Sequence, residues 1–243
     1  MQAIKSYIYF VIMVITAILY SIPSLLTFPF SFEKRYAFIR QWARFNIWSL
    51  KVICGLDFEI KGKENIPEGS IIVLSKHQST WETYAFQVIF QQHTWVLKKS
   101  LLKVPFFGWG LSLLKPVAID RSARKKAMEQ LSEQGSQRLD DGISIVIFPE
   151  GTRIAPGEKG RYKLGGARLA EISKRLVVPV AHNAGEFWPK HSMFKKRGKI
   201  TVSVLPAIDP AGMTASEINE LVETKIEQEM AQITTLKDAY ATK

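Results

Sequence analysis

A histidine and a glutamate five residues apart could act together as a general base. His77 follows the apolar run 71–75, which is typical of a buried strand, and Glu82 lies where a helical pattern begins. Ligands bind at the carboxyl ends of strands in open α/β sheets, so this histidine would face a substrate. A carboxylate in the first helical turn can orient one imidazole nitrogen and leave the other free to take a proton. The spacing alone is weak evidence, because such pairs also occur by chance.

A second polar turn follows the apolar run 143–148 and contains Glu150, Gly151, Thr152 and Arg153. Gly151 permits a tight turn with close backbone approach, Thr152 offers a hydroxyl, and the planar guanidinium of Arg153 suits a phosphate group. Glu150 either contacts the substrate or holds the turn through an ion pair with Arg153. Here too the chemistry would lie at the carboxyl end of a strand.

The two turns resemble the signatures of the glycerolipid acyltransferases. The span from His77 to Glu82 is similar to that family's HX4D/E motif, and residues 148–153 read FPEGTR, its second hallmark. Residues 108–121 and 177–180 resemble two further blocks in the family's order. The family more often has aspartate at the position of Glu82, so the pairing with His77 would need an adjusted geometry. The apolar amino terminus and basic surface resemble in particular the bacterial 1-acyl-sn-glycerol-3-phosphate acyltransferases.

The resemblance implies a reaction and a set of site residues. An acyl group would pass from a thioester, acyl-CoA or acyl carrier protein, to the free hydroxyl of 1-acyl-glycerol-3-phosphate (lysophosphatidic acid), giving phosphatidic acid. We expect His77 to deprotonate that hydroxyl directly, because no nucleophile elbow is present. We expect Arg121 and Arg153 to bind the phosphate. The other candidates for substrate binding are Glu150, Gly151, Thr152, Lys98 and Lys163.

Alternative functions remain open at this stage. The same base and anion site would serve glycerol-3-phosphate or a lysolipid such as a lyso-ornithine lipid as acceptor. A non-catalytic basic membrane-binding protein would explain the charge and the apolar terminus, but not the two motifs. Ser79 could be a nucleophile, although a position at the start of a helix suits it better. Residues 106–114 are rich in apolar side chains and either line an acyl-chain groove or pack in the core.

The elements that must position these residues alternate along the chain after Gly55. Strands are expected at 57–61, 71–75, 95–98, 116–119, 143–148, 177–181 and 199–205, and helices at 81–91, 124–140 and 166–176. This alternation predicts an α/β fold with a mixed, mainly parallel sheet covered by helices. Thr214 and Glu217 predict the capped start of a further helix that packs on the sheet. We divide the chain into a membrane-anchoring helical segment, 1–55, and a catalytic domain, 56–243.

The amino-terminal segment has the composition of a membrane anchor. Residues 6–32 carry no charge, and this uncharged segment is long enough to cross a bilayer. Pro23 and Pro29 should break or kink the helix, so the segment either spans the membrane or dips into it. One lysine precedes it and four cations follow, and this imbalance predicts that the rest of the chain lies on the cytoplasmic side. The resemblance to bacterial enzymes implies that the membrane is the inner membrane of a bacterium. Residues 35–54 favour an interfacial amphipathic helix or a helix packed on the catalytic domain.

Net charge indicates which kinds of partner the chain binds, and the cysteine and histidine content indicates whether it holds a disulfide or a metal. The 243 residues include 33 lysines and arginines against 22 acidic residues, and the net charge of +11 indicates an anionic partner. We expect anionic membrane lipids rather than nucleic acid, with the basic clusters 124–126 and 195–197 meeting lipid headgroups or an acidic carrier protein. Cys54 is the only cysteine and the four histidines are scattered, so neither a disulfide nor a metal is expected. No cofactor is expected besides the thioester substrate.

Overall fold

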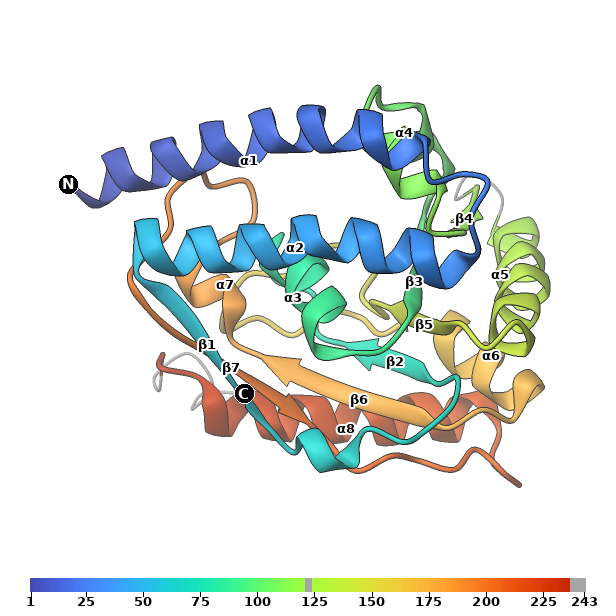
Figure 1. The fold of residues 1–243 in the computed structure, drawn as a ribbon. Helices are drawn as coiled ribbons and strands as arrows, with labels where there is room; N and C mark the ends of the chain where they lie inside the picture. Colours follow the sequence, from blue (N-terminus) through green and yellow to red (C-terminus); the bar gives the residue numbers. More distant parts are fainter. Residues whose placement is uncertain (121–123, 237–243) are drawn as a thin grey trace.

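The computed structural model describes residues 1–120 and 124–236, which fold around one seven-stranded sheet (Figure 1). The strand order is β1-β7-β6-β2-β5-β3-β4. Within the described residues β6 and β7 form the only antiparallel pair, so the expected mixed, mainly parallel sheet is confirmed. The strands are β1 Leu56–Lys61, β2 Ile72–Ser75, β3 His93–Lys98, β4 Val117–Ile119, β5 Ser144–Ile147, β6 Val177–His182 and β7 Gly198–Val204.

Eight helices accompany the sheet in the part of the chain that the structure describes. They are α1 Gln2–Leu25, α2 Phe32–Cys54, α3 Trp81–Ile89, α4 Phe107–Ser112, α5 Arg124–Asp140, α6 Gly165–Ser173, α7 Ala184–Phe187 and α8 Ala215–Ile233, with 3-10 turns at Lys63–Asn65 and Lys99–Lys103. The expected helix at 124–140 agrees with α5 at both ends, whereas α3 and α6 end earlier than expected. The short α4 and α7 were not anticipated, because each is too brief to show a clear hydrophobic period.

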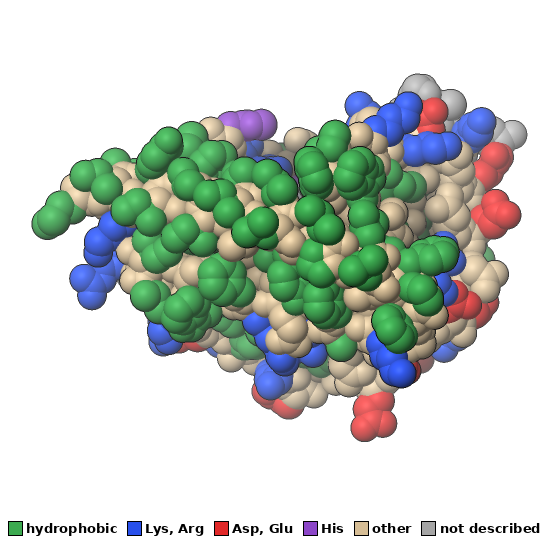
Figure 2. Space-filling view, turned by 45° about the horizontal axis from the view of Figure 1, so that its top comes forward, with side chains coloured by type: hydrophobic (Ala, Val, Ile, Leu, Met, Phe, Trp, Pro, Cys, Tyr) green, Lys and Arg blue, Asp and Glu red, His purple; other side chains and the backbone are tan. Residues whose placement is uncertain are grey.

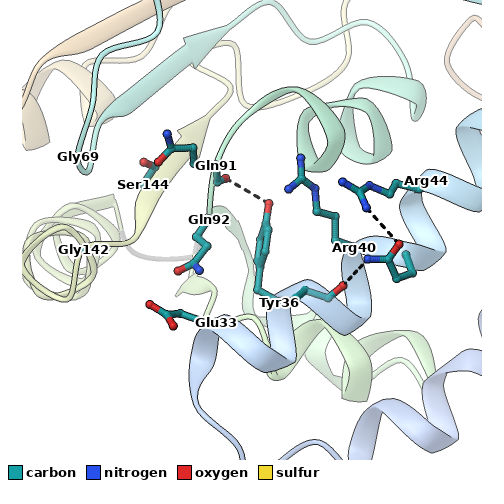
Figure 3. Close-up of a pocket in the computed structure, with 11 residues that line it drawn as sticks. Glu33, Tyr36, Arg40, Arg44, Gly69, Gln91, Gln92, Gly142 and Ser144 are labelled. Atoms are coloured by element: carbon teal, nitrogen blue, oxygen red, sulfur yellow. Dashed lines mark hydrogen bonds between the residues drawn. The ribbon is translucent and has the colours of Figure 1, made fainter.

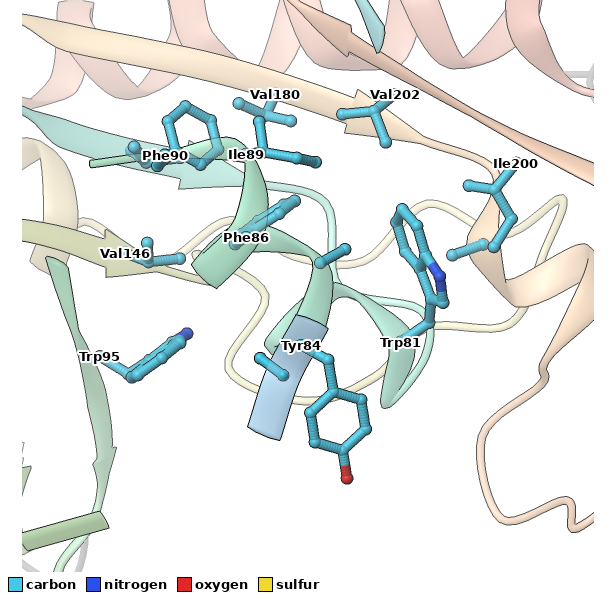
Figure 4. Close-up of a cluster of buried hydrophobic side chains, with 14 of the residues drawn as sticks. Trp81, Tyr84, Phe86, Ile89, Phe90, Trp95, Val146, Val180, Ile200 and Val202 are labelled. Atoms are coloured by element: carbon cyan, nitrogen blue, oxygen red, sulfur yellow. The ribbon is translucent and has the colours of Figure 1, made fainter. Parts of the chain in front are cut away.

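Alternate residues of the central strands face two separate cores, as the pleat of a strand requires. Val73 of β2 belongs to the core shared with α1, α2 and α3, whereas Ile72 and Leu74 belong to the core shared with α5, α6 and α8. Figure 1 shows α1 and α2 on one side of the sheet and α8 on the other. In the first core, aromatic side chains of α3 lie against β-branched residues of the sheet, as Figure 4 shows for Trp81 and Phe86. Both faces of the sheet are therefore covered, as a mainly parallel sheet demands.

Two helix boundaries follow from backbone chemistry at single residues. α2 ends at Gly55, which has a left-handed φ of 68°, a conformation that glycine adopts without strain. α8 begins with the predicted capping box: the Thr214 hydroxyl accepts from the Glu217 N–H, and the Glu217 carboxylate accepts from the Thr214 N–H. The packing of α8 on the sheet is also confirmed.

The amino-terminal segment forms a helical hairpin on the sheet. α1 contains Pro23, ends at Leu25, and is followed by a turn that leads into α2, so the expected break falls next to this proline. α1 is long and apolar enough to cross a membrane, and only 17% of its most apolar 18-residue stretch is buried. Tyr9 of α1 and Leu50 of α2 nevertheless belong to the same core as Trp81. The hairpin therefore packs on the sheet and α3 through one side and leaves much of its apolar surface uncovered.

His93 is a buried titratable residue that joins β3 to α2. Its imidazole is fully buried, and Nδ1 lies 3.0 Å from the Tyr36 hydroxyl and 2.9 Å from the carbonyl oxygen of Gln91. Burial lowers the pKa of His93 to about 4, so the folded protein holds this ring neutral at physiological pH.

We predict that His93 makes the free energy of unfolding fall as the pH decreases from about 6.5 to about 4. In this window the unfolded chain protonates the residue, whose ordinary pKa is about 6.5, while the folded chain does not. His93→Asn should remove up to about 3 kcal/mol of this pH-dependent loss. Denaturant unfolding in detergent across this pH range would measure it. The exposed residue His191 provides the control: His191→Asn should keep the wild-type slope, and an unchanged slope in His93→Asn would contradict the prediction.

Candidate active site

His77 and Glu82 meet in the loop between β2 and α3. Nδ1 of His77 lies 2.8 Å from Oε1 of Glu82, and the N–H groups of Gln78 and Ser79 donate to the same oxygen at 3.0 and 2.8 Å. The Glu82 side chain is fully buried, whereas 16% of the His77 side chain is exposed. The carboxylate thus fixes the orientation of the imidazole and leaves Nε2 available to a substrate.

The charge of Glu82 is maintained despite its burial. Burial alone would raise its pKa, but the imidazoles of His182 and His77 and the N–H of Ser79 outweigh this effect and hold the pKa below its ordinary value. His182 lies behind the pair, with Nε2 2.9 Å from the Lys76 carbonyl oxygen and Nδ1 accepting from the Ala184 N–H at 3.3 Å. This arrangement requires the neutral Nε2–H tautomer, and burial lowers the pKa of His182 accordingly.

The turn after β5 is bonded directly to the histidine loop. Phe148 stacks on His77 with the ring centroids 4.0 Å apart and the planes 12° from parallel. The Ile154 N–H donates to the His77 carbonyl oxygen at 2.8 Å, and Arg153 Nη1 donates to Thr80 Oγ1 at 3.0 Å. Because β2 and β5 are neighbouring parallel strands, both turns leave the sheet at the same edge.

Gly151 suits this turn because of its backbone conformation. Its φ of 69° lies in the left-handed region, and a Cβ at this position would also displace the ammonium of Lys163. The backbone of Lys163 is held in turn, because its N–H donates to the Pro149 carbonyl oxygen at 2.9 Å. The glycine therefore makes room for a cation beside the turn.

Glu150 lies beneath the turn rather than at its surface. Its side chain is fully buried, with Oε1 2.9 Å from Nζ of Lys76 and Oε2 accepting from the His77 N–H at 2.8 Å. The two roles expected from the sequence were contact with the substrate and an ion pair with Arg153. The structure instead pairs this carboxylate with Lys76 and with the backbone of His77.

A cavity of about 1020 Å³ opens at this edge of the sheet. Its polar and charged lining includes His77, Thr80, Thr152 and the cations Lys98, Arg153, Arg161 and Lys163. Its apolar lining comes from several elements and includes Ala17, Trp42, Leu101, Phe106, Leu111, Leu114, Leu131 and Phe148. The structure thus brings the imidazole of His77, several cations and an apolar surface into one space, which is large enough for part of a lipid.

Some cavity residues differ from those expected. Arg161 and His191 line the cavity but belong to loops without a recognisable motif, so no sequence pattern indicated either residue. Lys98 and Lys163 do line it, together with four residues of the apolar stretch 106–114. Arg121 lies outside the described residues.

Lys195 does not belong to a lipid-facing basic cluster. It is fully buried, and its ammonium lies 4.6 Å from the ring centroid of Trp188 and 5.1 Å from that of Tyr9. Its backbone N–H donates to the Ser6 hydroxyl at 2.9 Å. The expectation that residues 195–197 together meet anionic headgroups is wrong for this lysine, because aromatic rings distant in the sequence enclose its charge.

A second pocket of about 600 Å³ lies at the opposite edge of the sheet, where β3 and β5 begin (Figure 3). Its polar side chains hold elements of the protein together. Arg40 Nη2 donates to the Val88 carbonyl oxygen at the end of α3, and the Tyr36 hydroxyl reaches His93 and Gln91. We therefore place the chemistry in the larger cavity, beside His77.

Comparison with known proteins decides the family. A family model described as Acyltransferase matches residues 57–183. The 1-acyl-sn-glycerol-3-phosphate acyltransferase of Pseudomonas aeruginosa is 42% identical over 241 residues, which cover 97% of this chain and 94% of that protein. The chain belongs to the Acyltransferase family. The resemblance seen in the motifs is thereby confirmed.

One further relative agrees with this assignment, and one solved structure shares the fold. The 1-acyl-sn-glycerol-3-phosphate acyltransferase of Saccharomyces cerevisiae is 32% identical over 82% of this chain and 67% of its own. The crystal structure of the 1-acyl-sn-glycerophosphate (LPA) acyltransferase from Thermotoga maritima has a TM-score of 0.81 over 96% of both chains, at 21% identity. This last similarity shows that the fold is shared.

We predict that acyl transfer depends on the pair formed by His77 and Glu82. His77→Ala should lower kcat roughly 100-fold to 10,000-fold, the range that general bases contribute. Glu82→Gln should lower kcat at least about 10-fold, because an amide does not stabilise an imidazolium as a carboxylate does. Thioester consumption by the purified protein in detergent would measure both. Glu171→Gln, which breaks only an outlying contact with Arg168, should retain full activity; substantial turnover by His77→Ala would disprove the assignment of the base.

Proposed function

We propose that this acyltransferase moves an acyl group from a thioester to the free hydroxyl of 1-acyl-glycerol-3-phosphate and so makes phosphatidic acid. The proposal rests on the residues that line the cavity. His77 could accept the proton of the hydroxyl, four cations could bind the phosphate, and the apolar lining could hold the acyl chain. The printed names of the relatives from Pseudomonas aeruginosa and Saccharomyces cerevisiae support this acceptor.

In the proposed mechanism His77 acts by direct base catalysis. Its Nε2 takes the proton of the acceptor hydroxyl, whose oxygen attacks the thioester carbonyl carbon. As the tetrahedral intermediate collapses, the C–O bond remains, the C–S bond breaks, and the departing thiolate receives the proton from the imidazolium. Glu82 stabilises that imidazolium through the bond to Nδ1. The Ser79 hydroxyl accepts the Trp81 N–H at 3.1 Å, which supports a role in starting α3 rather than a role as nucleophile.

The acceptor phosphate would lie among the cations beside the FPEGTR turn. Arg153 belongs to this turn, Lys163 lies beside Gly151 of the turn, and Lys98 and Arg161 line the same cavity. A guanidinium binds phosphate through two parallel hydrogen bonds, whereas lysines act as point charges, so we assign Arg153 the main contact. Acyl-CoA and acyl carrier protein both supply the thioester, and the proposed reaction requires no further cofactor.

The apolar face of the helical hairpin would hold the protein on the inner membrane of a bacterium, with the catalytic part in the cytoplasm. Figure 2 shows apolar side chains gathered over α1 and α2, with basic side chains at the edges. The most exposed large apolar residues of these helices include Ile4, Tyr7, Ile15, Leu19, Ile22, Trp48 and Val52. A patch of this size on a soluble protein would be unusual, and a bilayer would cover it.

An acceptor panel would test the proposed function. Purified protein in detergent would receive palmitoyl-CoA or palmitoyl carrier protein with lysophosphatidic acid, glycerol-3-phosphate or a lyso-ornithine lipid. We predict the highest kcat/KM for lysophosphatidic acid, and Arg153→Ala should raise the KM for it about 10-fold or more, the loss expected for a charged hydrogen bond. Arg175→Ala, which breaks an exposed ion pair with Asp140, is the control. A higher kcat/KM for another acceptor would show that the proposed substrate is wrong. An unchanged KM in Arg153→Ala would show that Arg153 does not bind the acceptor phosphate.

The membrane assignment predicts that acidic residues on α1 release the protein from vesicles. Ile15 and Leu19 are 50% and 63% exposed, so Ile15→Glu/Leu19→Glu should preserve the fold but reduce cosedimentation with phosphatidylglycerol-containing vesicles several-fold. Higher salt should weaken the remaining binding, because basic side chains flank the apolar face. Thr224→Glu/Gln228→Glu on α8 changes the charge similarly and should bind normally. Equal binding by both double variants would contradict this mode of attachment.

A further inference from the structure

Lys76, the residue before the proposed base, is buried with its charge. Nζ lies 2.9 Å from Oε1 of Glu150 and 2.8 Å from Oε1 of Glu227, and its side chain has no exposed surface. It also donates to the Glu158 carbonyl oxygen at 3.3 Å. An ammonium in a protein interior is costly unless it is paired and hydrogen-bonded, so this lysine must be held by its carboxylates.

The two carboxylates connect Lys76 in different directions. Glu150 uses its other oxygen, Oε2, to accept the backbone N–H of His77 at 2.8 Å. Glu227 belongs to α8 and accepts the Tyr162 hydroxyl at 2.9 Å through Oε1, the oxygen that Lys76 contacts. Burial, followed by the nearby carboxylates, raises the pKa of Tyr162, so this hydroxyl remains a donor. A continuous chain of contacts therefore runs from α8 to the backbone of the base.

The peptide groups on both sides of His77 are also held by other contacts. The Lys76 carbonyl oxygen accepts from His182 at 2.9 Å, and the His77 carbonyl oxygen accepts from the Ile154 N–H at 2.8 Å. With the backbone of His77 fixed at both its N–H and its carbonyl, the bond from Nδ1 to Glu82 determines the direction of the ring. Lys76 holds the carboxylate of Glu150 that accepts the N–H, and Glu227 is the second carboxylate that holds Lys76.

We propose that Glu227 is a positioning residue for His77, acting from α8 through Lys76 and Glu150. The inference rests on the proposed role of His77 as the base. α8 lies outside residues 57–183, to which the family model matches, and Glu227 lies in neither of the two motifs. It is not among the residues that line the cavity, so its effect should appear in turnover rather than in substrate binding.

Steady-state kinetics of Glu227→Ala and Glu227→Gln would test the proposal, with lysophosphatidic acid and whichever of palmitoyl-CoA and palmitoyl carrier protein the wild type uses. Glu227→Ala should lower kcat about 10-fold and leave both KM values within about twofold. Glu227→Gln should recover most of the rate, to within about threefold of wild type, because its amide oxygen can still accept from Lys76 and Tyr162. This graded recovery separates positioning from a general loss of stability.

Glu223 offers a matched control on the same helix, one turn earlier. Its carboxylate forms a partly exposed ion pair with Lys159 at 2.7 Å, so Glu223→Ala and Glu223→Gln should keep the wild-type kcat. Thermal unfolding would establish that each variant is folded. If Glu227→Ala does not fold, Glu227→Gln decides, and it should still lower kcat two- to threefold.

Two results would overturn the inference. One is a wild-type kcat in folded Glu227→Ala. If Glu227→Ala does not fold, a wild-type kcat in Glu227→Gln has the same meaning. The other is a raised acceptor KM with unchanged kcat, which would mean that α8 shapes the cavity instead. His77→Ala is assayed in parallel to separate this inference from the proposed function. An inactive His77→Ala beside a fully active Glu227→Ala defeats only the positioning role, whereas a fully active His77→Ala defeats the base and the inference together.

Discussion

The site depends on a single buried oxygen, Oε1 of Glu82. It accepts hydrogen bonds from the imidazole of His77 and from the N–H groups of Gln78 and Ser79. A buried carboxylate is tolerated only with such compensation, so the loop must close around it whenever the protein folds. The same closure sets the direction of the His77 ring. The folding of this loop therefore also orients the proposed base, and the additional methylene of glutamate does not prevent the contact.

The order of the strands in the sheet brings the two site loops together. β2 and β5 are parallel neighbours, with Ile72 opposite Ile145, so the loops that follow them emerge side by side. The Phe148 ring can then stack on His77, and Arg153 can reach Thr80. Helices cover both faces of the sheet, so the polar loops lie at the ends of the strands, and the larger cavity opens at the carboxyl ends.

Much of this arrangement could be predicted from local sequence, and some of it could not. The strands, α5 and the capping box of Thr214 depend on neighbouring residues, which explains why they were anticipated. The contact between Lys76 and Glu227 spans 151 residues, and no periodicity reports it. The aromatic enclosure of Lys195 likewise combines Tyr9 with Trp188, so a basic cluster in the sequence became a buried cation in the structure. Long-range charge pairing is a property of the folded chain alone.

α1 has two surfaces with different neighbours. Ala17, Tyr20 and Ser21 form part of the cavity wall, while Ile15, Leu19 and Ile22 point away from the protein. One helix therefore separates the proposed site of reaction from the surface proposed to enter lipid. An acceptor dissolved in the leaflet would arrive by lateral diffusion, without first dissolving in water. Its effective concentration would then be a mole fraction in the membrane, so dilution by inert lipid would slow the reaction even when the bulk concentration stays constant.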